Sequence, residues 1–283
     1  MKKQLLSIIL ILSFFILPLA GQSLRINPPD RPVQVFFELE TGLFGVNSHT
    51  FQSGINGTNF DFVTQGGQAV LYPFERYNAG MEISGKHRIA LLYQPLTVNT
   101  DVTFREDVMI DSVTFSAGTP MELKYGFPFY RITYTYFFTN NDRWKIGAGG
   151  ALQVRNASIV FKEINGEQMT VNQNVGPVPS INLYGKYTAN SGMYISIDAT
   201  GLYASSAIIN GASFEFEGSI LDASLRTGYP LLAGLDVFAN IRFLGGTSKG
   251  TSGYTDRTWS ESRQLYGTNY LATTAFTLGL SIY

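Results

Sequence analysis

The stretch that most constrains the fold runs from Phe129 to Val154, where apolar and polar residues alternate in two segments. A period of two places alternate side chains on opposite faces of a β-strand. Only the polar residues 139–143 separate the segments, which is too few for a crossover, so we predict two antiparallel neighbours in a hairpin. The apolar face carries Tyr130, Ile132, Tyr134, Tyr136, Phe138, Ile146, Ala148, Leu152 and Val154.

The same alternation returns along the rest of the chain and predicts about ten strands, with eight and twelve as alternatives because residues 97–123 are ambiguous. Segments of about 9–11 residues have the length that crosses a bilayer at a tilt. An open sheet edge in lipid would leave backbone groups unpaired, so the sheet must close. We therefore predict an all-β fold, a single antiparallel up-and-down transmembrane β-barrel. Its strands are 35–43, 76–83, 88–95, 129–138, 145–154, 180–187, 193–200, 221–229, 235–244 and 272–282.

The connections between these strands alternate in length, which separates the barrel from its main alternative, a secreted β-sandwich. In an up-and-down outer-membrane barrel the short turns collect at the periplasmic rim and the long loops lie outside. We predict a local break near Pro95, because proline removes one hydrogen bond of the ladder. The short turns are 84–86, 139–143, 189–192 and 232–234, and the long loops are 47–67, 97–123, 164–176, 205–218 and 245–267.

The first twenty residues have the pattern of a signal peptide. Lys2 and Lys3 precede the apolar run Leu5–Leu19, which is shorter than the roughly 20 residues of a membrane helix. We predict cleavage after residue 20 to 23 and a mature barrel over residues 24–283. Both strands and leader predict an integral outer-membrane protein of a Gram-negative-type bacterium, surrounded by lipid.

Composition narrows the classes of function. Charged residues make up 14% of the chain, against about 25% in a typical soluble domain. The net charge of −1 gives no electrostatic basis for binding nucleic acid. The chain has no cysteine, so closure of the backbone ladder rather than disulfides must stabilise the fold. We predict no cofactor and no transition-metal site, while carboxylates of the loops leave weak calcium binding open.

The polar face of the predicted strands carries charges of both signs. Asp222 and Arg226 share one strand, Asp236 and Arg242 share the next, and charge-assisted hydrogen bonds would satisfy such groups inside a barrel. A structural network that fills the lumen and a narrow polar path for small solutes both fit this pattern. The predicted lumen-lining residues are Glu38, Glu40, Arg76, Glu82, Arg88, Arg131, Lys145, Arg155, Lys186, Asp198, Asp222, Arg226, Asp236 and Arg242.

Three other groups of residues receive a structural interpretation. The outward Tyr and Phe residues predict aromatic girdles at the two membrane interfaces. Gly147, Gly149 and Gly150 precede no helical pattern, so we interpret them as giving room for large lumen side chains or allowing sharp coiling of the strand, rather than as a phosphate loop. His49 is predicted in the first outer loop and His87 beside a periplasmic turn, and neither indicates a catalytic triad.

The mature chain resembles the small outer-membrane β-barrel proteins of the OmpA/OmpW-like class. The resemblance consists of a signal peptide, alternating strands, short turns opposite long loops, and the terminal aromatic Tyr283. It implies insertion by the barrel-assembly machinery, which reads such an aromatic together with apolar residues two, four and six positions earlier. Here those positions are Ser281, Gly279 and Thr277, a departure from the pattern.

Three functional hypotheses follow. The first is a non-enzymatic barrel that acts as a structural protein or as a narrow porin-like channel for small solutes. The second is a surface recognition or adhesion protein that meets an extracellular partner through its long loops. The third, least supported by the residues, is a membrane-embedded hydrolase.

Overall fold

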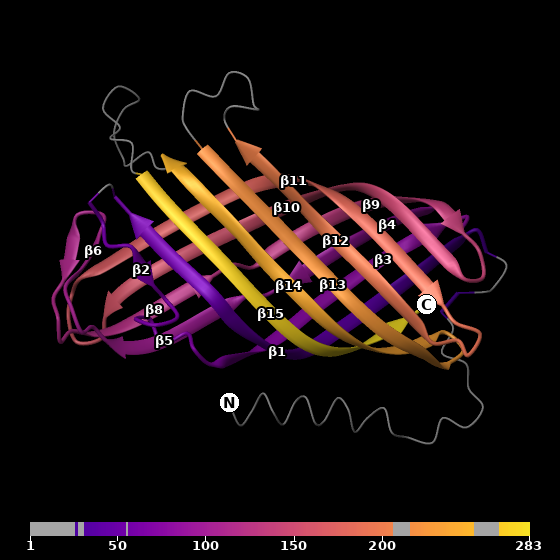
Figure 1. The fold of residues 1–283 in the computed structure, drawn as a ribbon, viewed down its shortest axis with the longest axis horizontal. Coiled ribbons are helices and arrows are strands. Elements are labelled where there is room, and N and C mark those ends of the chain that lie inside the picture. The colour runs from indigo at the N-terminus through magenta and orange to yellow at the C-terminus, as the bar shows by residue number, and fades with distance from the viewer. Residues whose placement is uncertain (1–25, 28–30, 55, 206–215, 252–265) are drawn as a thin grey trace.

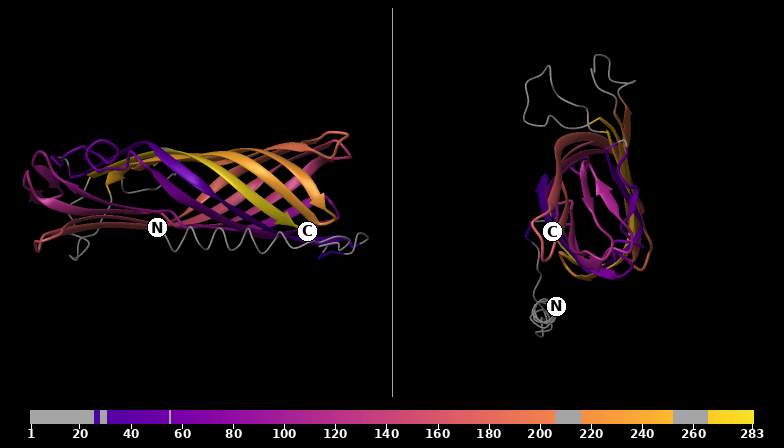
Figure 2. Two further views of the ribbon diagram at one scale, coloured as in Figure 1. Left: turned by 90° about the horizontal axis from the view of Figure 1, so that it is seen from below. Right: turned by 90° about the vertical axis from the view of Figure 1, so that its left-hand side faces the viewer.

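The computed structural model describes residues 26–27, 31–54, 56–205, 216–251 and 266–283, in which ten long strands form a closed antiparallel barrel. β1 pairs with β15, β10 pairs with β11, and the wall therefore meets itself (Figures 1 and 2). The predicted fold class and strand number are confirmed, whereas the predicted signal peptide lies outside the described residues. In order around the barrel, the strands are β1 (Val33–Ser53), β3 (Leu71–Ile83), β4 (His87–Gln94), β9 (Phe129–Asn140), β10 (Trp144–Glu163), β11 (Met169–Thr188), β12 (Tyr194–Ser205), β13 (Phe216–Leu232), β14 (Leu235–Thr251) and β15 (Tyr266–Ile282).

The wall turns its apolar side chains outward. Leu225, Ile241 and Phe276 are 50%, 49% and 64% exposed, whereas Arg242 is buried inside the barrel. Such an apolar belt is stable only in contact with lipid, and no helix among the described residues is long and apolar enough to cross a membrane.

The short turns lie where the sequence predicts them, at one end of the barrel (Figure 1). Between β3 and β4, Ser84 and Gly85 have φ values of 52° and 64°. These are the two central residues of a turn closed by the hydrogen bond from Lys86 N–H to Ile83 O. Two successive positive φ values match the right-handed twist of the flanking strands, which is why a glycine stands there. The predicted break at Pro95 is also present, since β4 ends at Gln94 and the next strand begins at Thr97.

The strands are longer than predicted at the opposite, outer end. β1 has 21 residues, which at about 3.3 Å per residue and a tilt of about 40° rise about 50 Å, twice the apolar band of about 25 Å. The predicted loops 47–67 and 164–176 are therefore wrong in part, because residues up to Ser53 belong to β1 and residues from Met169 belong to β11. The predicted loops 205–218 and 245–267 are also wrong in part, because β13 begins at Phe216 and β14 continues to Thr251. The centres of both loops lie outside the described residues.

The predicted projecting hairpin at residues 97–123 continues the wall beyond the membrane. β5 (Thr97–Thr103) pairs with β8 (Pro120–Gly126), and β8 pairs with the outer half of β10. Between them, β6 (Val108–Ile110) and β7 (Val113–Phe115) form a small second sheet, and β2 (Phe60–Asp61) pairs with β1. We call the outer ends of the long strands, together with β2 and β5–β8, the extracellular extension.

The polarity of the wall reverses where the extension begins. On β9 the outward residues Tyr130 and Ile132 are apolar and the inward Arg131 is charged. On β8 the outward Glu122 and Lys124 are charged, while the inward-facing residues, Leu123 among them, are apolar and buried. A belt facing lipid thus gives way to a wall facing water, and this reversal marks the outer membrane boundary.

The extension contains an apolar core that the predicted polar lumen did not include. Phe60 and Phe62 enter it from the segment around β2, Phe115 from β7 and Phe161 from β10, and all four are at most 1% exposed. Their ring centroids lie 5.0–6.4 Å apart where they are in contact, in tilted, stacked and edge-to-face pairs. Water-facing walls of this kind are stable because such a core holds them together.

The barrel wall opens along one seam in the extension. β11 and β12 pair only from Ile181–Gly201 to Thr188–Tyr194, and beyond that point the described residues of β11 pair with β10 alone. Pro177 and Pro179 lie on this unpaired length of β11. Both prolines lie inside the strand rather than before it. Proline is tolerated there because an edge needs no N–H donor.

Candidate lumen site

The lumen is crossed near its middle by five charged side chains, Glu40, Arg76, Arg131, Asp222 and Arg242, which we call the central cluster. Asp222 Oδ2 accepts hydrogen bonds from Arg76 Nη2 at 2.9 Å and from Arg131 Nη1 at 2.8 Å, and its Oδ1 accepts one from Arg242 Nη1 at 2.8 Å. The side chain of Asp222 is 1% exposed. The five side chains come from five different strands, so the cluster ties distant parts of the wall together.

Glu40 completes the cluster on the β1 side. Its Oε2 lies 3.2 Å from Arg242 Nη2, and its Oε1 accepts hydrogen bonds from Asn240 Nδ2 and Thr277 Oγ1. Gln94 Oε1 accepts a further hydrogen bond from Arg76 Nη1 at 2.7 Å. Buried ion pairs of this kind are stable only when further hydrogen bonds satisfy the remaining atoms, and here the neighbouring strands supply them.

On the periplasmic side of the central cluster, positively charged side chains contact inward aromatic rings, and some of them also contact carboxylates. Arg226 bonds Glu38 at 2.8 Å and lies 3.7 Å above the ring of Phe238. Arg88 lies 4.4 Å from the centroid of Phe36 and 5.5 Å from that of Tyr184. Cation–π contacts contribute about 0.5–2 kcal/mol each, the larger value where the pair is removed from water.

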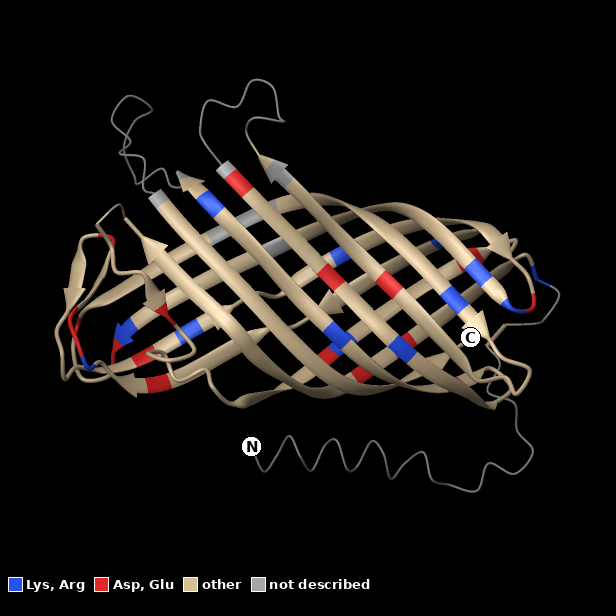
Figure 3. Cartoon of the chain, viewed as in Figure 1, with Lys and Arg blue, Asp and Glu red and all other residues tan. Residues whose placement is uncertain are grey.

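Two lysines repeat this arrangement. Lys145 forms an ion pair with Glu82 and lies 4.4 Å from the ring centroid of Phe137. Lys186 lies 3.8 Å from that of Tyr194. Figure 3 shows both signs of charge interspersed over many strands of the wall.

The structure places thirteen of the fourteen predicted lumen residues on the inner face, buried or half-buried, and the side chain of Arg155 lies outside the described part. The charged groups are paired between strands rather than along one strand. Asp222 bonds Arg242 rather than Arg226. Asp236 instead accepts a hydrogen bond from the hydroxyl of Tyr283 at 2.8 Å. Asp198 accepts one from Asn182.

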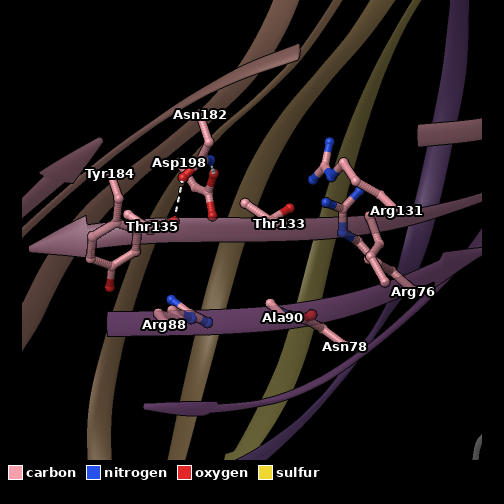
Figure 4. A pocket seen from close by; sticks show the side chains of 11 residues that line it. Arg76, Asn78, Arg88, Ala90, Arg131, Thr133, Thr135, Asn182, Tyr184 and Asp198 are labelled. Carbon is pink, nitrogen blue, oxygen red and sulfur yellow. Dashed lines mark hydrogen bonds between the residues drawn. The ribbon is translucent and has the colours of Figure 1, made fainter. Parts of the chain in front are cut away.

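A small cavity lies beside the central cluster, on its periplasmic side. In Figure 4 the guanidinium groups of Arg76 and Arg131 lie together at one end and that of Arg88 lies at the other, with the short side chains of Ala90 and Thr133 between them. The cavity has a volume of about 30 Å³, enough for one or two water molecules.

The two histidines do not form a catalytic site with the described residues. His49 was predicted in an outer loop but lies on β1, fully buried, with Nδ1 2.8 Å from Gln68 Oε1 and its ring between Phe62 and Tyr125. His87 Nδ1 lies 2.8 Å from the hydroxyl of Tyr134 on the outer face. The described residues also contain no group of three His, Asp or Glu side chains that could hold a metal ion.

Sequence reasoning gave no role to the inward aromatic rings of the periplasmic half. The signal that could have found them is an aromatic residue whose cross-strand neighbour is glycine on the same face. Gly228 pairs with Tyr194, and a Cβ on it would lie 2.3 Å from that ring. Gly279 pairs with Phe238, and a Cβ there would lie 2.2 Å from the ring. Each glycine makes room for a ring that lies flat across it.

A closed barrel with an apolar belt, a charged lumen and short turns at one rim defines an integral β-barrel protein of a bacterial outer membrane. The sequence matches no protein-family model and no curated protein sequence. Among solved structures it is similar to the outer membrane protease OmpT from Escherichia coli, at 9% identity and a TM-score of 0.53, over 88% of this chain and 96% of that one.

Two further solved structures share less of the shape. A Pseudomonas aeruginosa homologue of FadL is 9% identical with a TM-score of 0.38, over 89% of this chain and 90% of that chain. The outer membrane protein OprG from the same organism is 10% identical with a TM-score of 0.35, over 88% and 96%. At these identities the comparison with OmpT shows the fold alone. The fold is that of the small outer-membrane β-barrels.

Proposed function

We propose that the protein is a structural outer-membrane barrel whose lumen is sealed by its own side chains. The observation that supports this best is the contact of Asp222 with Arg76, Arg131 and Arg242, because it connects the wall across the lumen at its middle. The apolar core of the extension fills the outer half above it. A ten-stranded barrel is only slightly wider than one that side chains fill completely, so we expect these two layers to block a continuous water path.

Planar-bilayer recording tests this proposal against the narrow channel. The purified protein should insert without stepwise current at moderate voltage of either sign. A matched pair of variants gives the assay a positive signal: Asp222→Ala removes the group that holds three arginines together, and Lys162→Ala removes an exposed cation of the extension. We expect brief openings only with Asp222→Ala. Regular stepwise openings of the unaltered protein, altered by Arg131→Ala, would establish the channel instead.

A second candidate is recognition of an extracellular partner, and the extension favours it. Its walls stand well above the membrane boundary on continuous strands, and an internal core of aromatic rings makes them rigid, as a surface that contacts a partner needs to be. The test displays the protein on bacteria and measures attachment to a layer of cells. Replacing the exposed tip residues Arg105, Glu106 and Asp107 with serine should reduce attachment without changing folding.

Hydrolysis has no support among the described residues. His49 is shut away from solvent and bonds an amide, and His87 lies on the outer face with tyrosines. Histidine is the side chain that most often acts as a general acid or base, and neither histidine lies at an accessible site inside the barrel, so a non-enzymatic role is the better proposal.

A further inference from the structure

The cavity beside the central cluster has an excess of positive charge. Its lining contains three arginines, Arg76, Arg88 and Arg131, and one carboxylate, Asp198. Asp222 bonds two of these arginines and leads on to Arg242 and Glu40, and Asn78 of the lining bonds Glu38, which is paired with Arg226. With these groups included, five cations face four anions and the net charge is +1. An uncompensated charge removed from water is costly unless a counter-charge or further hydrogen bonds offset it.

Several donors around the cavity have no partner among the described residues. Arg131 is 6% exposed and its Nε makes no hydrogen bond, and the Nε of Arg88 is also unpartnered. Arg88 forms no ion pair with any described carboxylate, and Glu38, whose negative charge acts on it, is already bonded to Arg226. Native structures rarely leave buried donors without a partner, so these groups indicate a missing acceptor.

The size of the cavity limits what that acceptor can be. A volume of about 30 Å³ admits one or two waters or a single monatomic anion, and it excludes sulfate, phosphate and carboxylate-bearing solutes together with their hydration. Small side chains produce the space: Ala90 pairs with Thr133, and Thr133 pairs with Ala151 on the next strand. Larger residues at these positions would have filled the lumen at this level, as they do on either side.

We propose that this cavity is a binding site for a halide ion, chloride under physiological conditions, held between Arg131 and Arg88. The ion neutralises the excess charge and accepts hydrogen bonds from guanidinium groups at both ends of the cavity. The hydroxyl of Thr133, which makes no hydrogen bond with a described residue, lies between them as a further donor. The site belongs to the interior of the barrel and does not depend on whether the lumen conducts.

Thermal unfolding of the folded barrel in detergent tests the site, with sodium chloride or bromide compared with sodium gluconate at equal ionic strength. A ligand that binds only the folded state raises its stability, and we expect the midpoint to rise by roughly 3–6 °C in either halide. Arg88→Gln should abolish the difference. Lys186→Gln is the matched control, because it removes another lumen cation that contacts an aromatic ring but does not line the cavity.

If Arg88→Gln folds poorly, two other variants and a crystallographic measurement still test the site. Asp198→Asn removes the only carboxylate of the lining and should increase the halide effect, whereas Ala90→Leu fills the space and should remove it. Crystals grown in bromide should show an anomalous peak between Arg131 and Arg88. An equal halide effect in the unaltered protein and Ala90→Leu, or a cavity holding only water in bromide crystals, would overturn the site.

Discussion

Asp222 on β13 and Arg131 on β9 meet across the barrel, with 2.8 Å between Oδ2 and Nη1, although four strand-to-strand steps of the wall separate them. The same carboxylate bonds two other arginines, so one buried anion holds three buried cations. Removing one partner of a buried ion pair leaves the other charged and unpaired, which costs far more than the net value of the pair.

Asp222→Ala should therefore destabilise the barrel by about 3–5 kcal/mol, because Arg76 and Arg131 would lose their only ion-pair partner among the described residues. The measurement is the free energy of unfolding in urea and detergent. Lys162→Ala is the control: the Lys162–Glu122 pair, 3.5 Å apart, is half-exposed and should contribute at most about 1 kcal/mol. Equal effects of the two substitutions would contradict a structural role for the central cluster.

The apolar core of the extension should behave as a separate unit of stability. Phe161 contacts the rings of Phe60, Phe62 and Phe115, so Phe161→Ala should cost about 3–5 kcal/mol and act mainly on the extension. Hydrogen exchange should show faster exchange in β5 and β8 with little change in the β14–β15 pairs of the membrane segment. Phe138→Ala, at a position 63% exposed on the outer face, creates no cavity and should leave exchange in β5 and β8 unchanged.

His49 makes the stability of the extension dependent on pH. Burial among Phe62 and Tyr125 lowers the pKa of His49 to about 4, and its hydrogen bond to Gln68 opposes this only in part. The unfolded chain, with a pKa near 6.5, binds the proton that the folded extension excludes. The stability from this neutral histidine is complete above about pH 6.5, falls as the pH drops toward 4, and by then about 3 kcal/mol is lost.

Limited proteolysis of the extension between pH 7.5 and 4.5 measures this dependence. Cleavage should increase toward the acid end in the unaltered protein and change much less in His49→Gln, which cannot take up the proton. His87→Gln alters a half-exposed histidine on the outer face and should retain the full dependence. A steep acid dependence that persists in His49→Gln would assign it to carboxylates instead.

The sequence predicts the membrane segment well because a single rule decides which side chains of the wall face outward and which face the lumen. Lipid outside and an enclosed lumen impose a period of two, and the positions of Phe276 and Arg242 follow directly from it. The extension breaks that rule: water faces its outer side, so inward Leu123 and outward Lys124 have the reverse sorting. The predicted polar loops there were wrong in part. The prediction expected every strand to have an apolar outer face, so strands with a polar outer face were interpreted as loops.

The partners within the lumen were harder to predict than its lining. A period of two fixes which side chains enter the lumen but does not fix how far each reaches across it, so Asp222 could not be matched to Arg131 from sequence. Ring positions depend on glycines of neighbouring strands, and that information requires the strand register. Gly279 departs from the apolar pattern of the final strand because a side chain there would overlap the ring of Phe238 on the paired strand.

Two glycines on neighbouring strands test whether close approach of β9 and β10 is needed for closure. A Cβ on Gly149 would lie 1.8 Å from the carbonyl oxygen of Tyr134, a backbone atom that cannot move without disturbing the ladder, whereas a Cβ on Gly185 meets nothing within 4 Å. Gly149→Ala should therefore force the two strands apart and lower the urea midpoint. Gly185→Ala should leave the midpoint unchanged or raise it slightly. Alanine restricts the unfolded chain more than glycine does, which can increase the free energy of unfolding by up to about 1 kcal/mol. If both variants fold with equal midpoints and equal heat-modified mobility on a gel, the tight coiling at Gly149 is not required, and the wall must be more adaptable than its backbone contacts imply.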